Sequence, residues 1–105
     1  MLVLLFYNKG PGNLITSNIT IRSMSISWET PKPNGGAIAY YNVTVENLSD
    51  GGLVYSTNVT TTCMHLDNLK TSTWYKYTVS ACARENDCGS AAVITAWTLL
   101  KSKPT

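Results

Sequence analysis

The residues of this 105-residue chain that could do covalent chemistry are three cysteines and one histidine. Cys82 and Cys88 lie six residues apart and flank a short run of turn-forming residues. If they face each other across an antiparallel hairpin, a disulfide can span the distance between them. Such a bond would stiffen the hairpin and stabilise the fold by about 2 kcal/mol. The alternative is a pair of reduced thiols in a cytosolic protein. We favour the disulfide, with Cys82 on the outward side of its strand.

The third cysteine, Cys63, precedes His65 by two residues, so on a strand both side chains would point the same way. An imidazole beside a thiol can lower the thiol pKa, and the pair could supply two metal ligands. A zinc site needs two more ligands, and the chain has no second histidine. We therefore expect no metal and no cofactor. Cys63 is expected to be unpaired at the surface or bonded to a neighbouring module.

Asn-x-Ser/Thr sequences occur four times and could accept carbohydrate if the chain is secreted. The pattern places one of these asparagines on the outward side of a strand and two others in or beside turns, where the modifying enzyme could reach them. Glycans on the strands would shield strand faces and leave the loops and ends free for contacts. The predicted glycosylation sites are Asn18, Asn42, Asn47 and Asn58.

Enzyme motifs are absent from the sequence. It contains no His/Glu metal motif, no Gly-rich phosphate loop and no nucleophile elbow. The six acidic residues are scattered over turns and strand ends. The net charge of +2 is small and no Lys/Arg cluster concentrates it, which argues against a nucleic-acid partner. We predict that this chain has no catalytic residues, although its parent protein could carry a catalytic domain elsewhere.

Strands must position these residues, because apolar and polar residues alternate over most of the chain and no helical period occurs. The strongest alternation places Met24, Ile26 and Trp28 on one face of a strand at 22–29. Runs rich in Pro, Gly, Asn and Asp separate the strands. Seven strands are expected, from Leu14 onward and at 22–29, 38–46, 53–55, 58–66, 75–83 and 91–99.

The last strand has two possible registers, with either Val93, Thr95 and Trp97 or Ile94, Ala96 and Thr98 facing inward. We favour the second register, which leaves Trp97 outside. Exposed tryptophans could be contact hot spots, or Trp74 and Trp97 could lie flat over a strand. The predicted core comprises Leu14, Ile26, Trp28, Tyr41, Val43, Leu66, Leu69, Tyr75, Tyr77, Val79 and Ala81.

Together these patterns predict an all-β fold, namely a seven-strand antiparallel sandwich of two sheets with immunoglobulin-like architecture. Several motifs then occur in a specific order and spacing: Pro11-Gly-Asn-Leu14, SISWETP, PNGGAIAYYNVTV, the segment 69–75, and YTVSA. In this order they resemble a fibronectin type III domain. The resemblance covers residues 11–100 and implies that the Trp28 indole packs against the opposite sheet and that Tyr75 is a tyrosine corner.

This resemblance also implies a domain layout and a function. Residues 1–10 are expected to be a linker or a truncated leader, and residues 101–105 a linker to the next module. The pattern is similar to modules in tandem arrays of animal cell-surface proteins, such as receptor-type tyrosine phosphatases and usherin-like proteins. The family's integrin-binding tripeptide is absent, since the last hairpin reads Arg84-Glu-Asn-Asp87.

We therefore expect a non-catalytic extracellular module of a cell-surface receptor or adhesion protein, which acts as a spacer and a protein contact domain. Its expected partners are adjacent fibronectin type III modules and an unidentified protein ligand, with no membrane insertion by this fragment. One alternative is an ectodomain fragment of a receptor-type protein tyrosine phosphatase. Another is an accessory domain of a secreted carbohydrate hydrolase.

Overall fold

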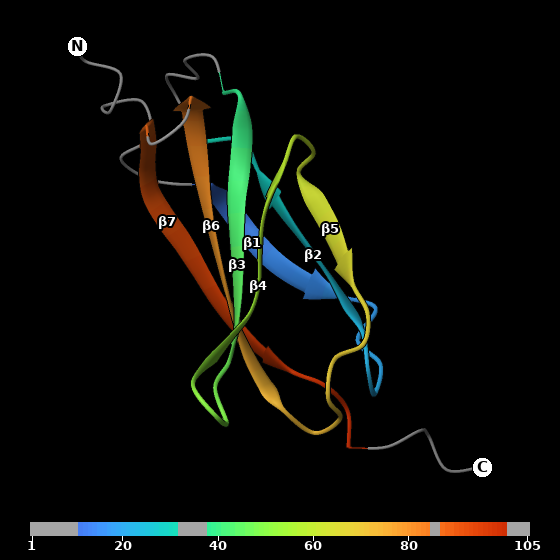
Figure 1. Ribbon diagram of the computed structural model, residues 1–105. Helices are drawn as coiled ribbons and strands as arrows, with labels where there is room; N and C mark the ends of the chain where they lie inside the picture. Colours follow the sequence, from blue (N-terminus) through green and yellow to red (C-terminus); the bar gives the residue numbers. More distant parts are fainter. Residues whose placement is uncertain (1–10, 32–37, 85–86, 101–105) are drawn as a thin grey trace.

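Two antiparallel sheets face each other in the computed structural model, which describes residues 11–31, 38–84 and 87–100 (Figure 1). The smaller sheet has the order β1-β2-β5, and the larger has the order β4-β3-β6-β7. The predicted seven-strand sandwich is confirmed, and the described residues form no helix. The strands are β1 (Gly12–Ser17), β2 (Met24–Glu29), β3 (Tyr40–Asn47), β4 (Gly52–Val59), β5 (Cys63–Leu66), β6 (Trp74–Arg84) and β7 (Asp87–Trp97).

The core lies between the sheets because each central strand turns one face of its period-2 alternation inward. Met24, Ile26 and Trp28 on β2 are buried, while the serines between them are only partly buried. Trp28 meets Tyr41 of β3 edge to face, with ring centroids 5.4 Å apart. This contact joins the two sheets, since β2 and β3 belong to different ones.

The residues predicted to form the core are buried, except Leu14, which is half-buried and packs against the core from β1. Met24 and Val45, which continue the same inward faces, also have no exposed surface. Thr98 is also fully buried, and its hydroxyl donates a hydrogen bond to the Lys70 carbonyl oxygen at 2.6 Å. The favoured register of the last strand is confirmed, with Ala96 and Thr98 inward and Trp97 exposed.

The prediction of one strand at 58–66 is wrong. Residues 58 and 59 end β4 in the larger sheet, whereas β5 in the smaller sheet begins at Cys63. The chain crosses between the sheets at residues 60–62, which are all threonine. Threonine suits both strands and bends, so the alternation conceals the crossing. The last strand also begins at Asp87 rather than at 91, because β7 pairs with β6 as far as Asp87 and Arg84.

A tyrosine corner closes the loop before β6. The Tyr75 hydroxyl accepts a hydrogen bond from the Lys70 amide at 2.7 Å, and the ring is buried. Two residues on, Tyr77 is fully buried, and among the described residues its hydroxyl has no hydrogen-bond partner. Burial therefore raises the pKa of Tyr77 far above its usual range, and the neighbouring Tyr75 adds to the rise.

The predicted linkers at 1–10 and 101–105 lie outside the described residues, as does most of the turn after Pro31. In the described part of the chain, no helix is long and apolar enough to cross a bilayer.

Candidate functional site

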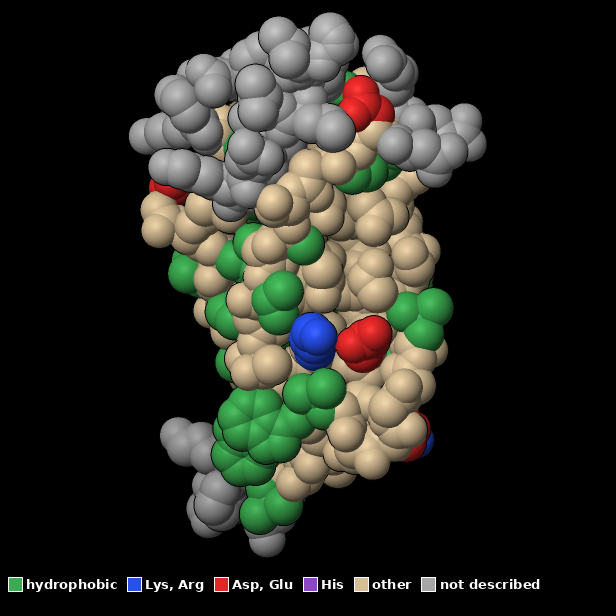
Figure 2. Space-filling model, turned by 90° about the vertical axis from the view of Figure 1, so that its left-hand side faces the viewer, with side chains coloured by type: hydrophobic (Ala, Val, Ile, Leu, Met, Phe, Trp, Pro, Cys, Tyr) green, Lys and Arg blue, Asp and Glu red, His purple; other side chains and the backbone are tan. Residues whose placement is uncertain are grey.

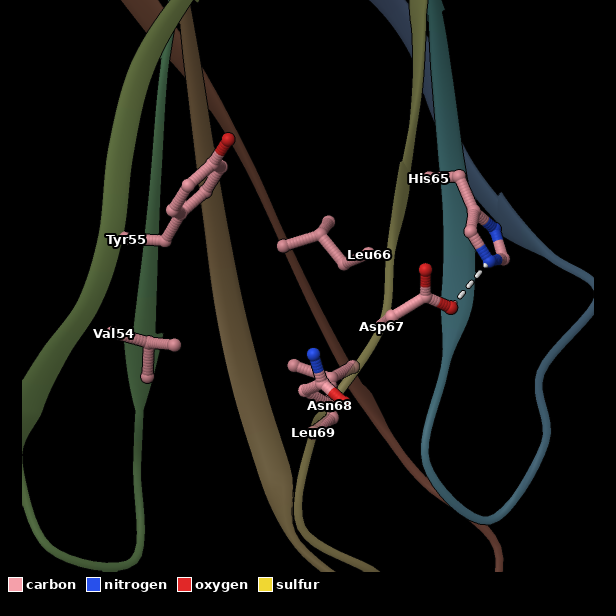
Figure 3. A pocket seen from close by; sticks show the side chains of 7 residues that line it. All are labelled: Val54, Tyr55, His65, Leu66, Asp67, Asn68 and Leu69. Atoms are coloured by element: carbon pink, nitrogen blue, oxygen red, sulfur yellow. Dashed lines mark hydrogen bonds and ion pairs between the residues drawn. The ribbon is translucent and has the colours of Figure 1, made fainter.

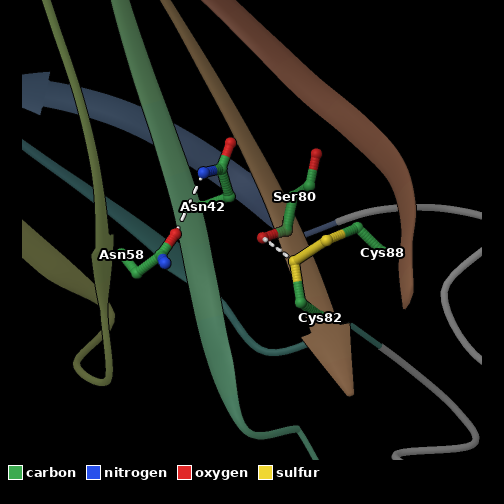
Figure 4. Close-up of a disulfide and its surroundings, with 5 residues drawn as sticks. All are labelled: Asn42, Asn58, Ser80, Cys82 and Cys88. Atoms are coloured by element: carbon green, nitrogen blue, oxygen red, sulfur yellow. Dashed lines mark hydrogen bonds between the residues drawn. A yellow bond between two sulfur atoms is a disulfide. The ribbon is translucent and has the colours of Figure 1, made fainter. Parts of the chain in front are cut away.

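A disulfide joins Cys82 of β6 to Cys88 of β7, with Cα atoms 4.0 Å apart (Figure 4). The two residues are cross-strand partners, which is the arrangement that the hairpin pattern predicted. The Cys82 sulfur lies 3.9 Å from the carbonyl oxygen of Ser80. Because an oxidised sulfur carries no proton, this approach is a van der Waals contact. The bond joins β6 and β7 close to Arg84 and Asp87, the last partners in their register.

Cys82 lies on the outward side of β6, as the sequence predicted, but the residue is buried. Cys82 lies on the same side of the sheet as Ser80 and Asn42 (Figure 4), yet none of its surface is accessible. Its register partners Tyr40 and Cys88 flank it on both sides, so a small side chain is covered from two neighbouring strands. The disulfide is thus shielded on the β6 side.

Cys63 is exposed and unpaired on β5. Cys63 and His65 do not form a pair, because both imidazole nitrogens have other hydrogen-bond partners. Nδ1 lies 2.9 Å from the Ser25 hydroxyl, and Nε2 lies 3.0 Å from an Asp67 carboxylate oxygen. Among the described residues, no group of three or more His, Cys, Asp or Glu side chains could hold a metal ion.

The Ser25–His65–Asp67 network was not predicted, because Ser25 lies 40 residues before His65. Only the pairing of β2 with β5 brings the two together. The order hydroxyl, imidazole, carboxylate is also that of a nucleophile, its base and an orienting acid. However, the His65 and Asp67 side chains are 50% and 69% exposed. Hydrogen bonds between such exposed groups compete with water and lack the dry, preorganised surroundings that catalysis uses, so the network is a surface feature.

Two predicted glycosylation sites are cross-strand partners. Asn42 of β3 and Asn58 of β4 face each other in register. The Asn42 amide nitrogen donates a hydrogen bond to the Asn58 side-chain oxygen at 3.0 Å (Figure 4). Asn58 is exposed on an edge strand, whereas Asn42 is half-buried on an inner one. Asn18 is exposed just after β1. Asn18 and Asn58 are thus the more accessible of the four predicted glycosylation sites.

Asn47, in contrast, is buried, with only 4% of its surface exposed. Its side-chain oxygen accepts a hydrogen bond from the Ser49 amide at 2.8 Å. The expectation that the enzyme could reach it in the turn is wrong for the folded chain. The physical reason is the period of β3, because the alternation of Tyr41, Val43 and Val45 continues inward to Asn47. A glycan on Asn47 would not fit this fold.

Trp74 and Trp97 form an exposed aromatic pair on the outer face of the larger sheet. They are cross-strand partners and stack with centroids 5.9 Å apart and planes at 16°. On the side of the molecule shown in Figure 2, hydrophobic side chains gather near the lower end. The two indoles cover each other and still leave about half of each residue exposed. Exposed aromatic residues of this kind are typical of protein contacts.

A cleft of about 360 Å³ opens at the side of the sandwich, between β4 and the segment that follows β5 (Figure 3). Val54 and Tyr55 line it from β4, and Leu66 and Leu69 line it from the opposite side. Asp67 also lines it, with its carboxylate turned away from β4 and toward His65 (Figure 3). The cleft was not predicted, because its walls come from the edge strands of two different sheets.

Comparison with protein-family models gives a match to the fibronectin type III domain over residues 9–96. None of the curated proteins matches the chain. Among solved structures, the fn3 domain of the human collagen alpha-1(XX) chain is 27% identical, with a TM-score of 0.76. That match covers 94% of this chain and 92% of the collagen domain.

Two longer structures show the same fold. Domains d3–d4 of the rat CD45 extracellular region are 23% identical, with a TM-score of 0.73 over 88% of this chain. A two-domain fibronectin type III segment of chicken tenascin is 21% identical, with a TM-score of 0.74 over 86% of this chain. The chain spans about half the length of each, 51% and 49% respectively.

Proposed function

The chain belongs to the fibronectin type III family, and from that premise we propose that it is a non-catalytic module of an extracellular protein. In this role it separates neighbouring modules of a tandem array and presents its faces to other proteins. Two of the similar structures support the proposal. One comes from an extracellular region, and the other is a segment of two such domains.

The disulfide is the observation that carries the proposal. Disulfides persist in oxidising compartments and are rare in the cytosol, where thiols are kept reduced. The Cys82–Cys88 bond is shielded on one side, since Cys82 has no accessible surface. It fixes a surface hairpin, a kind of element that sandwich modules use for contacts. The bond therefore favours a module that works outside the cell.

The dense packing between the two sheets supports a non-catalytic role. Large side chains occupy the space between the sheets. The Ser25–His65–Asp67 network is the arrangement closest to catalytic chemistry, and it is exposed to water. The remaining surface features, the stacked indoles and the apolar cleft, suit contact with a protein.

Carbohydrate on Asn58 fits this role. A glycan there would project from an edge strand on the outer face of the larger sheet. The aromatic pair lies toward the other end of the same face. Asn42, the partner of Asn58, pairs with Ser80 of β6. Asn47, five residues further along β3, pairs with Tyr75, which follows Trp74. Five residues of strand separate these two points by about 17 Å. A glycan at Asn58 would leave the indoles free for contact.

The mass of the secreted chain tests the proposal. We expect the chain, secreted from animal cells behind a signal peptide, to lose mass when a peptide-N-glycosidase removes its glycans. Asn58→Gln should remove one glycan because Asn58 is exposed. Asn47→Gln is the matched control and should leave the glycan mass unchanged, since Asn47 is buried. A secreted chain whose mass does not respond to the glycosidase would contradict the glycoprotein role.

A further inference from the structure

The sandwich is uneven at one side. The smaller sheet ends at β5, which has four residues and pairs only with β2. The larger sheet ends at β4, which has eight residues and pairs only with β3. Among the described strands, none lies beside β5 on its far side. An edge strand of this kind leaves a row of backbone donors and acceptors available for another strand.

A bulge on β4 enlarges the apolar surface at this opening. Val45 pairs with Tyr55, but Glu46 pairs with Leu53, so Val54 is an extra residue in the strand. As a result, Val54 and Tyr55 both point toward the gap beside β5 (Figure 3), whereas successive residues of a regular strand point to opposite faces. They are 45% and 44% exposed. These side chains form an apolar wall that the smaller sheet does not cover.

We propose that the cleft binds one extended segment of a partner protein, which adds to the free edge of β5 as a fourth strand. The segment's inward side chains would pack against Val54 and Tyr55, and its backbone would pair with β5. This inference rests on the proposed role as a contact module. A volume of about 360 Å³ accommodates a few side chains, so alternate residues would enter the cleft and the others would remain in water.

The charges at the cleft define the segment further. Strand β4 carries no charged residue, which favours an uncharged partner strand rich in β-branched residues. Asp67 is the only carboxylate among the described residues that line the cleft. One of its oxygens contacts His65 Nε2 at 3.0 Å, but the side chain is 69% exposed, so its other oxygen can meet a cation. A lysine or arginine at one end of the segment would meet this carboxylate, whereas an acidic residue there would be repelled. The expected occupant is thus an extended, alternating apolar segment with a basic end.

Glycosylation leaves this surface open. Asn58 lies on β4, but it is paired with Asn42, whose side chain alternates with the inward Tyr41 and Val43. The two asparagines therefore face away from the cleft. A glycan on Asn58 and a segment beside Tyr55 can be present together.

Selection from a displayed library of random octapeptides tests the inference, with the secreted full chain as the target. We expect enrichment of sequences that alternate β-branched residues and carry Lys or Arg near one end. The selected peptides should bind Val54→Lys at least about tenfold more weakly. Leu53→Lys is the matched control, because Leu53 is exposed on the same strand but points to the other face. Its affinity should change less than about twofold.

Three outcomes would overturn the inference. The selection could enrich no peptide, or it could enrich peptides that bind Val54→Lys as well as wild type. The chain could instead form a dimer that Val54→Lys dissociates, which would assign the cleft to a second copy. Circular dichroism of both lysine variants verifies that they are folded. A chain that is glycosylated and disulfide-bonded but binds no peptide overturns this inference and leaves the proposed function in place.

Discussion

Replacing Trp28 with alanine is expected to lower the free energy of unfolding by about 3–5 kcal/mol. The indole is 4% exposed and joins the two sheets through its edge-to-face contact with Tyr41. Its removal would leave a cavity that neighbouring strands, held by their own hydrogen bonds, cannot close. Because small domains are stable by only about 5–15 kcal/mol, the variant would be close to unfolding. Urea denaturation followed by far-UV circular dichroism measures the loss.

Trp97→Ala is the matched control for this experiment. It removes the same side chain from a position that is 45% exposed and whose ring stacks on Trp74. Loss of that contact should cost about 0.5–1.5 kcal/mol. If Trp28→Ala melts within a degree or two of wild type, or if both variants lose the same stability, the assignment of the core is wrong.

Tyr75→Phe is expected to lower the free energy of unfolding by about 1–3 kcal/mol, because it leaves the Lys70 amide without its acceptor. The ring itself stays in place, so the change isolates a single hydrogen bond. Chemical denaturation at neutral pH measures the difference. A variant as stable as wild type would show that the tyrosine corner contributes nothing to this fold.

Tyr77→Phe provides the contrast, because the hydroxyl that it removes has no hydrogen-bond partner among the described residues. We expect unchanged or slightly increased stability at neutral pH. The pKa of Tyr77 is raised in the folded state. The unfolded chain therefore loses the Tyr77 phenolic proton at a lower pH than the folded chain does. The stability that Tyr77 contributes is complete below the unfolded-state pKa of about 10 and is lost as pH rises above that value. Tyr77→Phe should reduce the loss of stability at alkaline pH.

The inward faces of β2, β3 and β6 could be predicted from the sequence because alternation alone determines them. Met24, Ile26 and Trp28 follow period 2 without interruption, as do Tyr75, Tyr77 and Val79. The same rule would have placed Asn47 inward, but its position before a turn suggested exposure. The crossing between the sheets at residues 60–62 could not be predicted from the sequence, because threonine continues the alternation through a bend.

The disulfide could be predicted because it is local, between strands joined by one short turn. The Asn42–Asn58 pair and the Ser25–His65–Asp67 network could not, because each depends on which strands pair and in which register. A shift of one residue in either pairing would turn these side chains to the other face. The cleft depends in addition on the bulge at Val54, for which the sequence carries no glycine signal.

Under the proposed function, these features lie on separate parts of the module's surface. The predicted glycosylation site Asn58 lies on the outer face of the larger sheet, and the stacked indoles lie toward one end of that face. The cleft opens at the side, between the two edge strands. A partner could therefore bind at the indoles or at the cleft while a glycan covers the region between Asn42 and Asn58.

Thiol labelling of the secreted chain tests most directly whether this module is built for the outside of the cell. The chain is collected from the medium of animal cells, unfolded in denaturant without reductant, and treated with iodoacetamide. Mass spectrometry of proteolytic fragments should find one labelled residue, Cys63, and a fragment pair joined through Cys82 and Cys88. After reduction all three cysteines should be labelled. Labelling of all three before reduction would contradict the account.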